Sequence, residues 1–214
     1  MSEQYALVIE GLESLADLDS LPRDIITAAR RAVNHAATRG RTEMGREVLQ
    51  QIKFPADYVS PRNKRLFVSK QAKGGDLEAI ITARRRSTSL SRFAQTGGKG
   101  GNIRVELKRG AVRQIPGKRD ENRGYSAFLI RLKAGNADLD TKHNMGFALR
   151  VPPGRRPDAA YAPKPLGGNL WLLYGPSVSQ LILPVKNSRA GVAETLTPDI
   201  QDRLNDEFWR QMDL

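Results

Sequence analysis

The chain has 214 residues, of which 39% are hydrophobic, so it is long enough to bury a sizeable core. It contains no cysteine, which excludes disulfides, thiolate nucleophiles and sulfur metal sites. No run approaches the roughly 18 apolar residues that a membrane span requires, and the acidic N-terminus does not resemble a targeting segment. The composition therefore predicts a soluble protein that folds in a reducing cytosol and has no membrane partner.

The net charge of +12 is unevenly distributed along the chain. Residues 1–22 carry five acidic residues and no basic one, and residues 176–214 carry six acidic residues against four basic ones. The segment between them, residues 23–175, carries 31 basic residues against 12 acidic ones. This pattern is typical of a protein near nucleic acid or near acidic protein surfaces. A basic surface that only keeps the protein soluble would give the same composition.

The first predicted element is a long helix. Ser20 is expected to cap it, and small apolar residues from 25 to 37 recur at helical spacing on one face. Gly40 interrupts this pattern, and a second helical stretch runs from Glu43 to Ile52. Either one helix bends near Gly40 or two helices meet there.

Between about 64 and 175 the apolar residues follow a strand pattern. Strands are predicted at 77–84, 103–108, 127–132, 146–151 and 169–174. Extended loops are predicted near 94–102, 116–124 and 152–168, where glycine, proline and charged residues cluster.

A last helix is predicted with Thr197 as its N-cap and Pro198 at its first position. Its apolar residues form one stripe that must bury against the same chain or against another subunit. The candidate subunit-interface residues are Ile200, Leu204, Phe208 and Trp209.

The order of elements predicts an α+β fold, in which the long N-terminal helix and the C-terminal helix pack on a mostly antiparallel sheet. We expect an acidic N-terminal arm over 1–22, followed by a single domain over 23–214 with the extended loops already named.

No set of residues with the spacing of a known catalytic or metal site is present. The two histidines, His35 and His143, are far apart in the sequence, and neither belongs to a recognisable ligand motif. The glycine-rich segment 97–101 lacks the Ser or Thr and the following helix of a phosphate-binding loop. We therefore predict that the protein is not an enzyme and has no catalytic residue, metal or cofactor.

Two pairs of acidic residues are close enough in sequence to bind a metal ion, although isolated pairs of this kind are usually solvated. They are Glu43 with Glu47 and Asp138 with Asp140. A metal-dependent nuclease that uses them is kept as a third hypothesis.

Basic clusters are the remaining candidate sites. Arginine suits both phosphates and the carboxylates of a partner subunit. No aromatic residue is interleaved with these clusters in the sequence, so base stacking is not expected, and any DNA contact would be to the backbone. The candidate DNA- or partner-facing residues are Arg84, Arg85, Arg86, Lys99, Arg155 and Arg156.

The order of several segments resembles that of phage minor tail proteins of the lambda Z type. The likeness covers roughly residues 22–212, and its motifs are structural rather than catalytic. It rests on the Ala-rich stretch 28–36, the segments 77–84 and 87–93, the alternating strand from Ile103, Phe128, the segment 147–150 and the segment 173–178.

This resemblance implies a structural virion protein that acts in tail completion or head–tail joining, at the neck or the head-proximal end of the tail. Proteins at this position usually form homo-oligomeric rings, commonly hexamers. The implied neighbours are the tail terminator, the stopper and the tail tube, with phage DNA in the channel. The implied location is the virion, and the host cytoplasm during assembly. The alternative function is non-specific nucleic-acid binding.

Overall fold

The structure, a computed structural model, describes residues 5–9, 22–95, 102–115, 125–132, 144–183 and 191–213. The chain divides into two compact units, whereas the sequence predicts one domain behind an acidic arm. Unit 1 consists of residues 1–49, 56–85 and 178–214, and unit 2 consists of residues 50–55 and 86–177. Each unit is described separately below.

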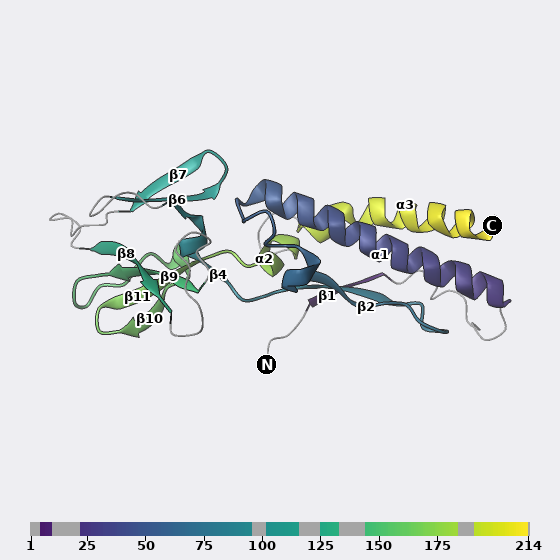
Figure 1. The fold of residues 1–214 in the computed structure, drawn as a ribbon, viewed down its shortest axis with the longest axis horizontal. Helices are drawn as coiled ribbons and strands as arrows, with labels where there is room; N and C mark the ends of the chain where they lie inside the picture. The colour runs from purple at the N-terminus through teal and green to yellow at the C-terminus, as the bar shows by residue number, and fades with distance from the viewer. Residues whose placement is uncertain are drawn as a thin grey trace. The chain divides into compact units, whose positions relative to one another are not determined.

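Unit 1 combines the two long helices with a small antiparallel sheet (Figure 1). The strand order in this sheet is β1-β3-β2. The elements of unit 1 are β1 (Tyr5–Ile9), α1 (Arg23–Gln51), η2 (Pro61–Asn63), β2 (Leu66–Lys70), β3 (Ala79–Ala83), α2 (Val178–Ile182) and α3 (Val192–Met212). The predicted acidic arm therefore contains a strand, β1, which pairs with β3.

The buried face of α1 consists mainly of small residues, as the spacing of the stretch 25–37 predicts. Small side chains allow a neighbouring helix or sheet to approach the α1 backbone closely, since little volume separates them. The buried residues are Ala28, Ala29, Ala32, Val33, Ala36, Ala37, Gly40, Met44, Gly45 and Val48.

The helices α1 and α3 are antiparallel. Arg31 Nη1 donates a hydrogen bond to Gln211 Oε1 at 3.4 Å, and His35 Nδ1 lies 3.5 Å from Glu207 Oε2. Positions that ascend along α1 thus contact positions that descend along α3. Both helices lie in unit 1, and Figure 1 shows them side by side.

The helix α1 continues through Gly40, which decides between the two predicted arrangements in favour of one helix of 29 residues. The reason for a glycine here is tertiary. A Cβ atom at this position would lie 2.8 Å from Ile200 Cδ1 of α3. Gly40 therefore marks a close helix contact rather than a helix end.

The predicted start of the C-terminal helix is wrong. The helix α3 begins at Val192, so Pro198 lies inside it and Thr197 does not cap it. The Thr197 hydroxyl instead donates to the carbonyl oxygen of Ala193 at 2.8 Å. Pro198 has no N–H group and cannot make one of the intrahelical hydrogen bonds, but burial of Val192 and Ala193 favours the additional turn.

Unit 2 contains two antiparallel sheets (Figure 1). One has the order β10-β11-β9-β8 with β4 paired to β11, and the other has the order β5-β6-β7. The elements are β4 (Thr88–Ser89), η3 (Leu90–Phe93), β5 (Ala94–Gln95), β6 (Ile103–Lys108), β7 (Ala111–Ile115), β8 (Ser126–Arg131), β9 (Met145–Arg150), η4 (Ala159–Tyr161), β10 (Lys164–Gly167) and β11 (Leu170–Gly175).

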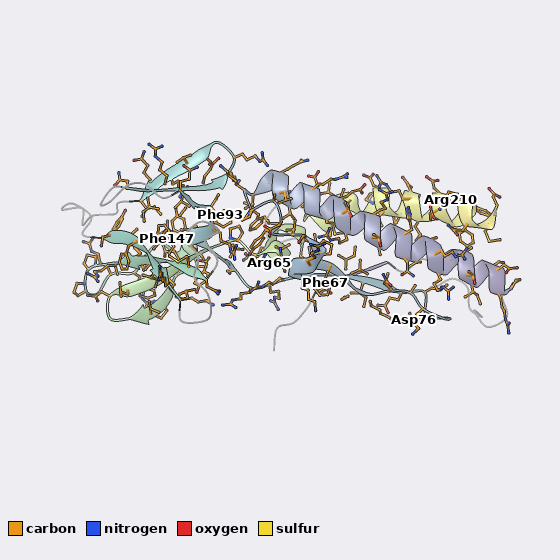
Figure 2. All side chains as sticks on the ribbon, in the orientation of Figure 1. Arg65, Phe67, Asp76, Phe93, Phe147 and Arg210 are labelled. Carbon is orange, nitrogen blue, oxygen red and sulfur yellow. The ribbon has the colours of Figure 1, made fainter. Side chains whose placement is uncertain are left out.

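The core of unit 2 forms around β9, in which every residue from Met145 to Leu149 is buried. A run of this kind is expected for a strand with both faces covered. The ring of Phe93 lies 5.5 Å from that of Phe54, and Figure 2 shows Phe93 and Phe147 among the strands of this unit.

The loop prediction for 152–168 is wrong over its last part, because β10 pairs with β11 as a hairpin. Gly167 and Gly168, with φ of 126° and 56°, allow the chain to reverse there. The strand β7 was not predicted because its residues 111–114 are all exposed, so no apolar alternation marks it.

The predicted fold class is confirmed: the described residues form an α+β structure in which all strand pairs are antiparallel. The predicted strands at 77–84, 103–108, 127–132, 146–151 and 169–174 correspond to β3, β6, β8, β9 and β11. The predicted cap Ser20 and the loop residues 96–101 and 116–124 lie outside the described residues.

Candidate functional site

The three arginines at 84–86 occupy the point where the chain passes from unit 1 to unit 2. Arg84 is half-buried, whereas Arg85 and Arg86 are exposed. Both backbone polar groups of Arg84 form hydrogen bonds. Its N–H donates to the carbonyl oxygen of Arg65 at 2.9 Å, and its carbonyl oxygen accepts from Ser179 N at 3.2 Å. Arg84 thus also helps to hold unit 1 together.

Of the other predicted basic residues, Arg155 and Arg156 line a cavity in unit 2, which we call the arginine cavity. Its volume is about 570 Å³. Lys99 lies outside the described residues. The lining residues are Arg113, Gln114, Ile115, Tyr125, Leu149, Val151, Pro152, Arg155, Arg156, Pro157, Asp158, Tyr161 and Leu173.

The floor of the arginine cavity is apolar and comes from the central sheet. Leu149 belongs to β9, Val151 follows it directly, and Leu173 belongs to β11; all three are buried. Such a floor, surrounded by a few polar groups, is the usual composition of a ligand site.

One wall of the cavity is the segment 152–161, which is built from consecutive turns. Arg155 N donates to Pro152 O at 3.1 Å, and Tyr161 N donates to Asp158 O at 3.2 Å. Ala162 then has a φ of 41°, a conformation that L residues other than glycine rarely adopt. Strain of this kind often accompanies functional positions, and here it follows directly after a cavity-lining tyrosine.

Residues 113–115 of β7 also line the cavity, and one hydrogen bond joins them to this segment. Arg113 Nη1 donates to the Tyr161 hydroxyl at 3.1 Å. This bond, together with a weaker attraction to Asp158, raises the pKa of Arg113 above its ordinary value. Arg113 is therefore a permanent cation in the lining of the cavity.

Arg155 and Arg156 are both exposed, and among the described residues no side-chain hydrogen bond or ion pair engages either guanidinium. The five N–H donors of each group are arranged in a planar fork that fits phosphate or carboxylate oxygens. The lining contains three arginines and one acidic residue, Asp158, so it favours an anion.

The arginine cavity is not predictable from the sequence because the arginines and tyrosines that line it lie far apart in the chain. Tyr125 and Tyr161 are not interleaved with the arginines in sequence, which is why no stacking surface was expected. The structure brings both tyrosines to the same cavity as Arg155 and Arg156. The separation of arginines and aromatic residues along the sequence therefore does not hold in space at this cavity.

The net charge of the protein belongs entirely to unit 2. This unit contains 18 Lys and Arg residues against 6 Asp and Glu residues, whereas unit 1 contains 17 of each. A net charge of +12 on unit 2 and zero on unit 1 gives the two units different electrostatic behaviour toward polyanions.

The predicted interface residues of α3 differ in exposure. Ile200 is 3% exposed because it packs inside unit 1. Leu204 and Phe208 are half-buried, and Trp209 is 65% exposed. The Phe208 and Trp209 rings contact edge to face, with centroids 5.5 Å apart. Only the last part of the stripe thus remains accessible to another molecule.

Glu207 accepts hydrogen bonds from two other side chains of α3 and lies next to His35 of α1. Arg210 donates to it from Nε at 2.9 Å and from Nη2 at 2.5 Å, and Gln211 donates at 2.9 Å. These bonds, first among them those from Arg210, and the nearby His35 lower the pKa of Glu207 to about 2 despite its burial. Figure 2 labels Arg210 on α3.

The acidic pairs considered for metal binding do not assemble into a site in the described part of the chain. Glu43 forms an ion pair with Arg203 of α3, and its side chain is 18% exposed rather than solvated. Asp138, Asp140 and His143 lie outside the described residues. No group of three or more His, Asp or Glu side chains that could hold a metal ion occurs among the residues that the structure describes.

No helix in the described ranges is long and apolar enough to cross a membrane. Comparison of the chain with protein-family models, with curated proteins and with solved structures gave no match.

Proposed function

We propose that the protein is a structural subunit of a tailed-phage virion that completes the tail or joins it to the head, at the neck or the head-proximal tail end. The observation that carries this proposal is the division of charge between the two units, +12 on unit 2 and zero on unit 1. A protein at a head–tail junction meets both DNA and protein neighbours, and such a division suits both contacts.

The resemblance to phage minor tail proteins of the lambda Z type supports the same conclusion, since its segments span most of the chain. In this proposal, unit 2 contacts the DNA backbone electrostatically, without reading sequence. The protein resides in the host cytoplasm during assembly and then in the virion.

The exposed end of α3 supports self-assembly. Trp209 is a large apolar side chain exposed to solvent, and Met212 one turn later is also exposed. Aromatic residues and methionine are enriched at protein interfaces. We therefore place a subunit contact at this end of α3 in a homo-oligomeric ring, whose neighbours would be the tail terminator, the stopper and the tail tube.

The decisive experiment is removal of the protein from a phage that encodes it. We expect separate heads and tails, or particles that do not inject DNA, and rescue by the native chain supplied in trans. Electron microscopy of intact particles with a tagged chain should place the tag at the neck or tail end. Normal infectious virions without the protein would overturn the proposal.

A second candidate function is non-specific nucleic-acid binding by the isolated protein. The same concentration of positive charge on unit 2 favours it. Its affinity for duplex DNA should fall steeply with salt concentration, because several phosphates are neutralised. Purified protein that ignores duplex DNA at low salt would exclude this candidate and would also remove the DNA contact of unit 2 from the first proposal, leaving its protein contacts to be tested by the phage experiment.

A further inference from the structure

We infer that the arginine cavity of unit 2 binds one unpaired nucleotide, with the phosphate against the arginines and the base against the tyrosines and the apolar floor. The observation is the convergence of Arg113, Arg155 and Arg156 with Tyr125 and Tyr161 on one cavity. This site goes beyond the proposed function, because electrostatic contact with a duplex backbone needs no cavity.

The phosphate is assigned to the arginines because of their number and accessibility. Arg155 and Arg156 are exposed neighbours in the turn segment, and Arg113 lines the same cavity from the middle of β7. Guanidinium groups bind phosphate oxygens in pairs with charge-assisted hydrogen bonds. The single acidic residue of the lining, Asp158, lowers the local charge without cancelling it.

The base is assigned to the other part of the lining. Tyr161 is held in place by its hydrogen bond from Arg113, and Tyr125 is half-buried. Every nucleobase has an aromatic face, so tyrosine rings bind bases by stacking with little regard to sequence. Leu149, Val151 and Leu173, which are 7%, 5% and 2% exposed, complete the lining beside which the face of an aromatic base can be desolvated.

The size and chemistry of the cavity select an unpaired nucleotide. A volume of about 570 Å³ falls in the range of small-molecule sites. A base inside a duplex is paired and stacked and cannot enter such a cavity unless it is first extruded. The ligand is therefore a single nucleotide, either free or within a single strand.

An acidic peptide is the principal competitor, since carboxylates also fit arginine forks. It would use only the arginines and would leave the tyrosines and the apolar floor without a function in binding.

The test uses the full-length protein and a short fluorescent oligodeoxythymidine at low salt, with fluorescence anisotropy as the readout. We expect unlabelled oligodeoxythymidine to displace the probe better than a duplex of equal length or a polyglutamate peptide does. Thymidine monophosphate in excess should compete if the cavity takes free nucleotides, whereas competition by the strand alone would assign it to single-stranded nucleic acid. Stronger displacement by duplex or by polyglutamate would overturn the inference.

Variants locate the binding in the cavity. Tyr161→Ala should weaken binding roughly 5- to 150-fold, the range for removal of one stacking ring. Tyr161→Phe keeps the ring but loses the hydrogen bond from Arg113, so it should weaken binding less than Tyr161→Ala does. The double variant R155A/R156A should weaken binding and reduce the slope of log K against log salt by about 0.7 for each phosphate that the arginines no longer neutralise.

The matched control is the double variant R104A/R131A, which removes two exposed arginines of unit 2 that do not line the cavity. It should lower the affinity less than R155A/R156A does and leave the effect of Tyr161→Ala unchanged. Circular dichroism checks that each variant is folded. If Tyr161→Ala does not fold, the comparison of R155A/R156A with R104A/R131A still tests the inference. Equal reductions in affinity for the two arginine pairs in folded proteins would overturn the inference, and this outcome is independent of any effect on phage assembly.

Discussion

Gly40 of α1 and Ile200 of α3 are in such close contact that a Cβ atom at position 40 would force the Ile200 side chain to shift. A Cβ atom there would lie 2.8 Å from Ile200 Cδ1 and 3.2 Å from Ile200 Cγ1. Ile200 is buried and cannot move into solvent. The distance between the two helices of unit 1 is thus set at this position by the absence of a methyl group.

The first prediction is that Gly40→Ala destabilises the protein. Alanine gains about 1 kcal/mol in helix propensity over glycine, but overpacking a core typically costs about 1–3 kcal/mol. We expect a net decrease of about 1 kcal/mol in the free energy of unfolding, measured by urea denaturation.

Gly45→Ala is the matched control in the same helix. Its Cβ would meet Val59 and Leu66 at 3.7 and 3.8 Å, which are ordinary contacts, so we expect this variant to gain about 0.5–1 kcal/mol. In an Ile200→Val background, where Cδ1 is absent, Gly40→Ala should become neutral or stabilising. If Gly40→Ala stabilises the protein in the native background, the close contact inferred between position 40 and Ile200 is contradicted.

The second prediction concerns acid pH and Glu207. Its pKa is lowered to about 2 in the folded protein, whereas the ordinary value of glutamate is near 4.5. The folded state thus prefers the charged form, and the resulting stabilisation is fully present above about pH 4.5 and disappears as the pH falls toward 2. The melting temperature should fall over this range.

Glu207→Gln should make the melting temperature less dependent on pH between about 4.5 and 2 and lower it at neutral pH. The control is Asp202→Asn, an exposed acid on the same helix, which should leave the native pH dependence in place. If the melting temperatures of the native protein and of Glu207→Gln fall in parallel as the pH is lowered, the role assigned to Glu207 is refuted.

The third prediction concerns the β6–β7 hairpin. Glu106 Oε1 accepts a hydrogen bond from Gly110 N at 3.0 Å, at a turn where Gly110 has a φ of 79°. Glu106 also forms an ion pair with Lys53, which with the Gly110 bond lowers the pKa of Glu106. Glu106 Oε2 also accepts a hydrogen bond from Gln95 Nε2 at 3.2 Å, so Glu106→Ala should destabilise the hairpin by removing all three interactions.

Lys53→Ala removes only the ion pair, and the Lys53 side chain is 45% exposed, so its effect should be smaller. Hydrogen exchange of the β6 and β7 amides provides the measurement. We expect faster exchange in Glu106→Ala than in Lys53→Ala, and the reverse order would show that the bonds of Glu106 to Gly110 and Gln95 contribute little.

The fourth prediction separates assembly from stability. Trp209→Ala should change the free energy of unfolding of the monomer by less than about 0.5 kcal/mol, as is usual for exposed positions, but should prevent self-association. Val112→Ala removes another exposed apolar side chain, from unit 2, and should leave association intact. Sedimentation velocity tests both, and a Trp209→Ala protein that still assembles would remove α3 from the proposed interface.

Local patterns in the sequence were sufficient for much of the fold. The apolar alternation of 103–108 predicted β6 with its correct bounds, and the small-residue spacing of 25–37 predicted the buried face of α1. These predictions succeed because helix and strand periodicities are determined by neighbouring residues. The start of α3 was mispredicted because Thr197 and Pro198 carry a local start signal that burial of Val192 and Ala193 overrides.

The sequence by itself determined the α+β class, the identity of the main strands and helices, and the concentration of basic residues in the middle of the chain. Only the tertiary structure decided that Gly40 accommodates Ile200, that the whole net charge belongs to unit 2, and that Tyr125 and Tyr161 share a cavity with Arg113, Arg155 and Arg156. The physical reason is that periodicity and charge are properties of short segments, whereas close packing and cavities depend on residues far apart in the chain.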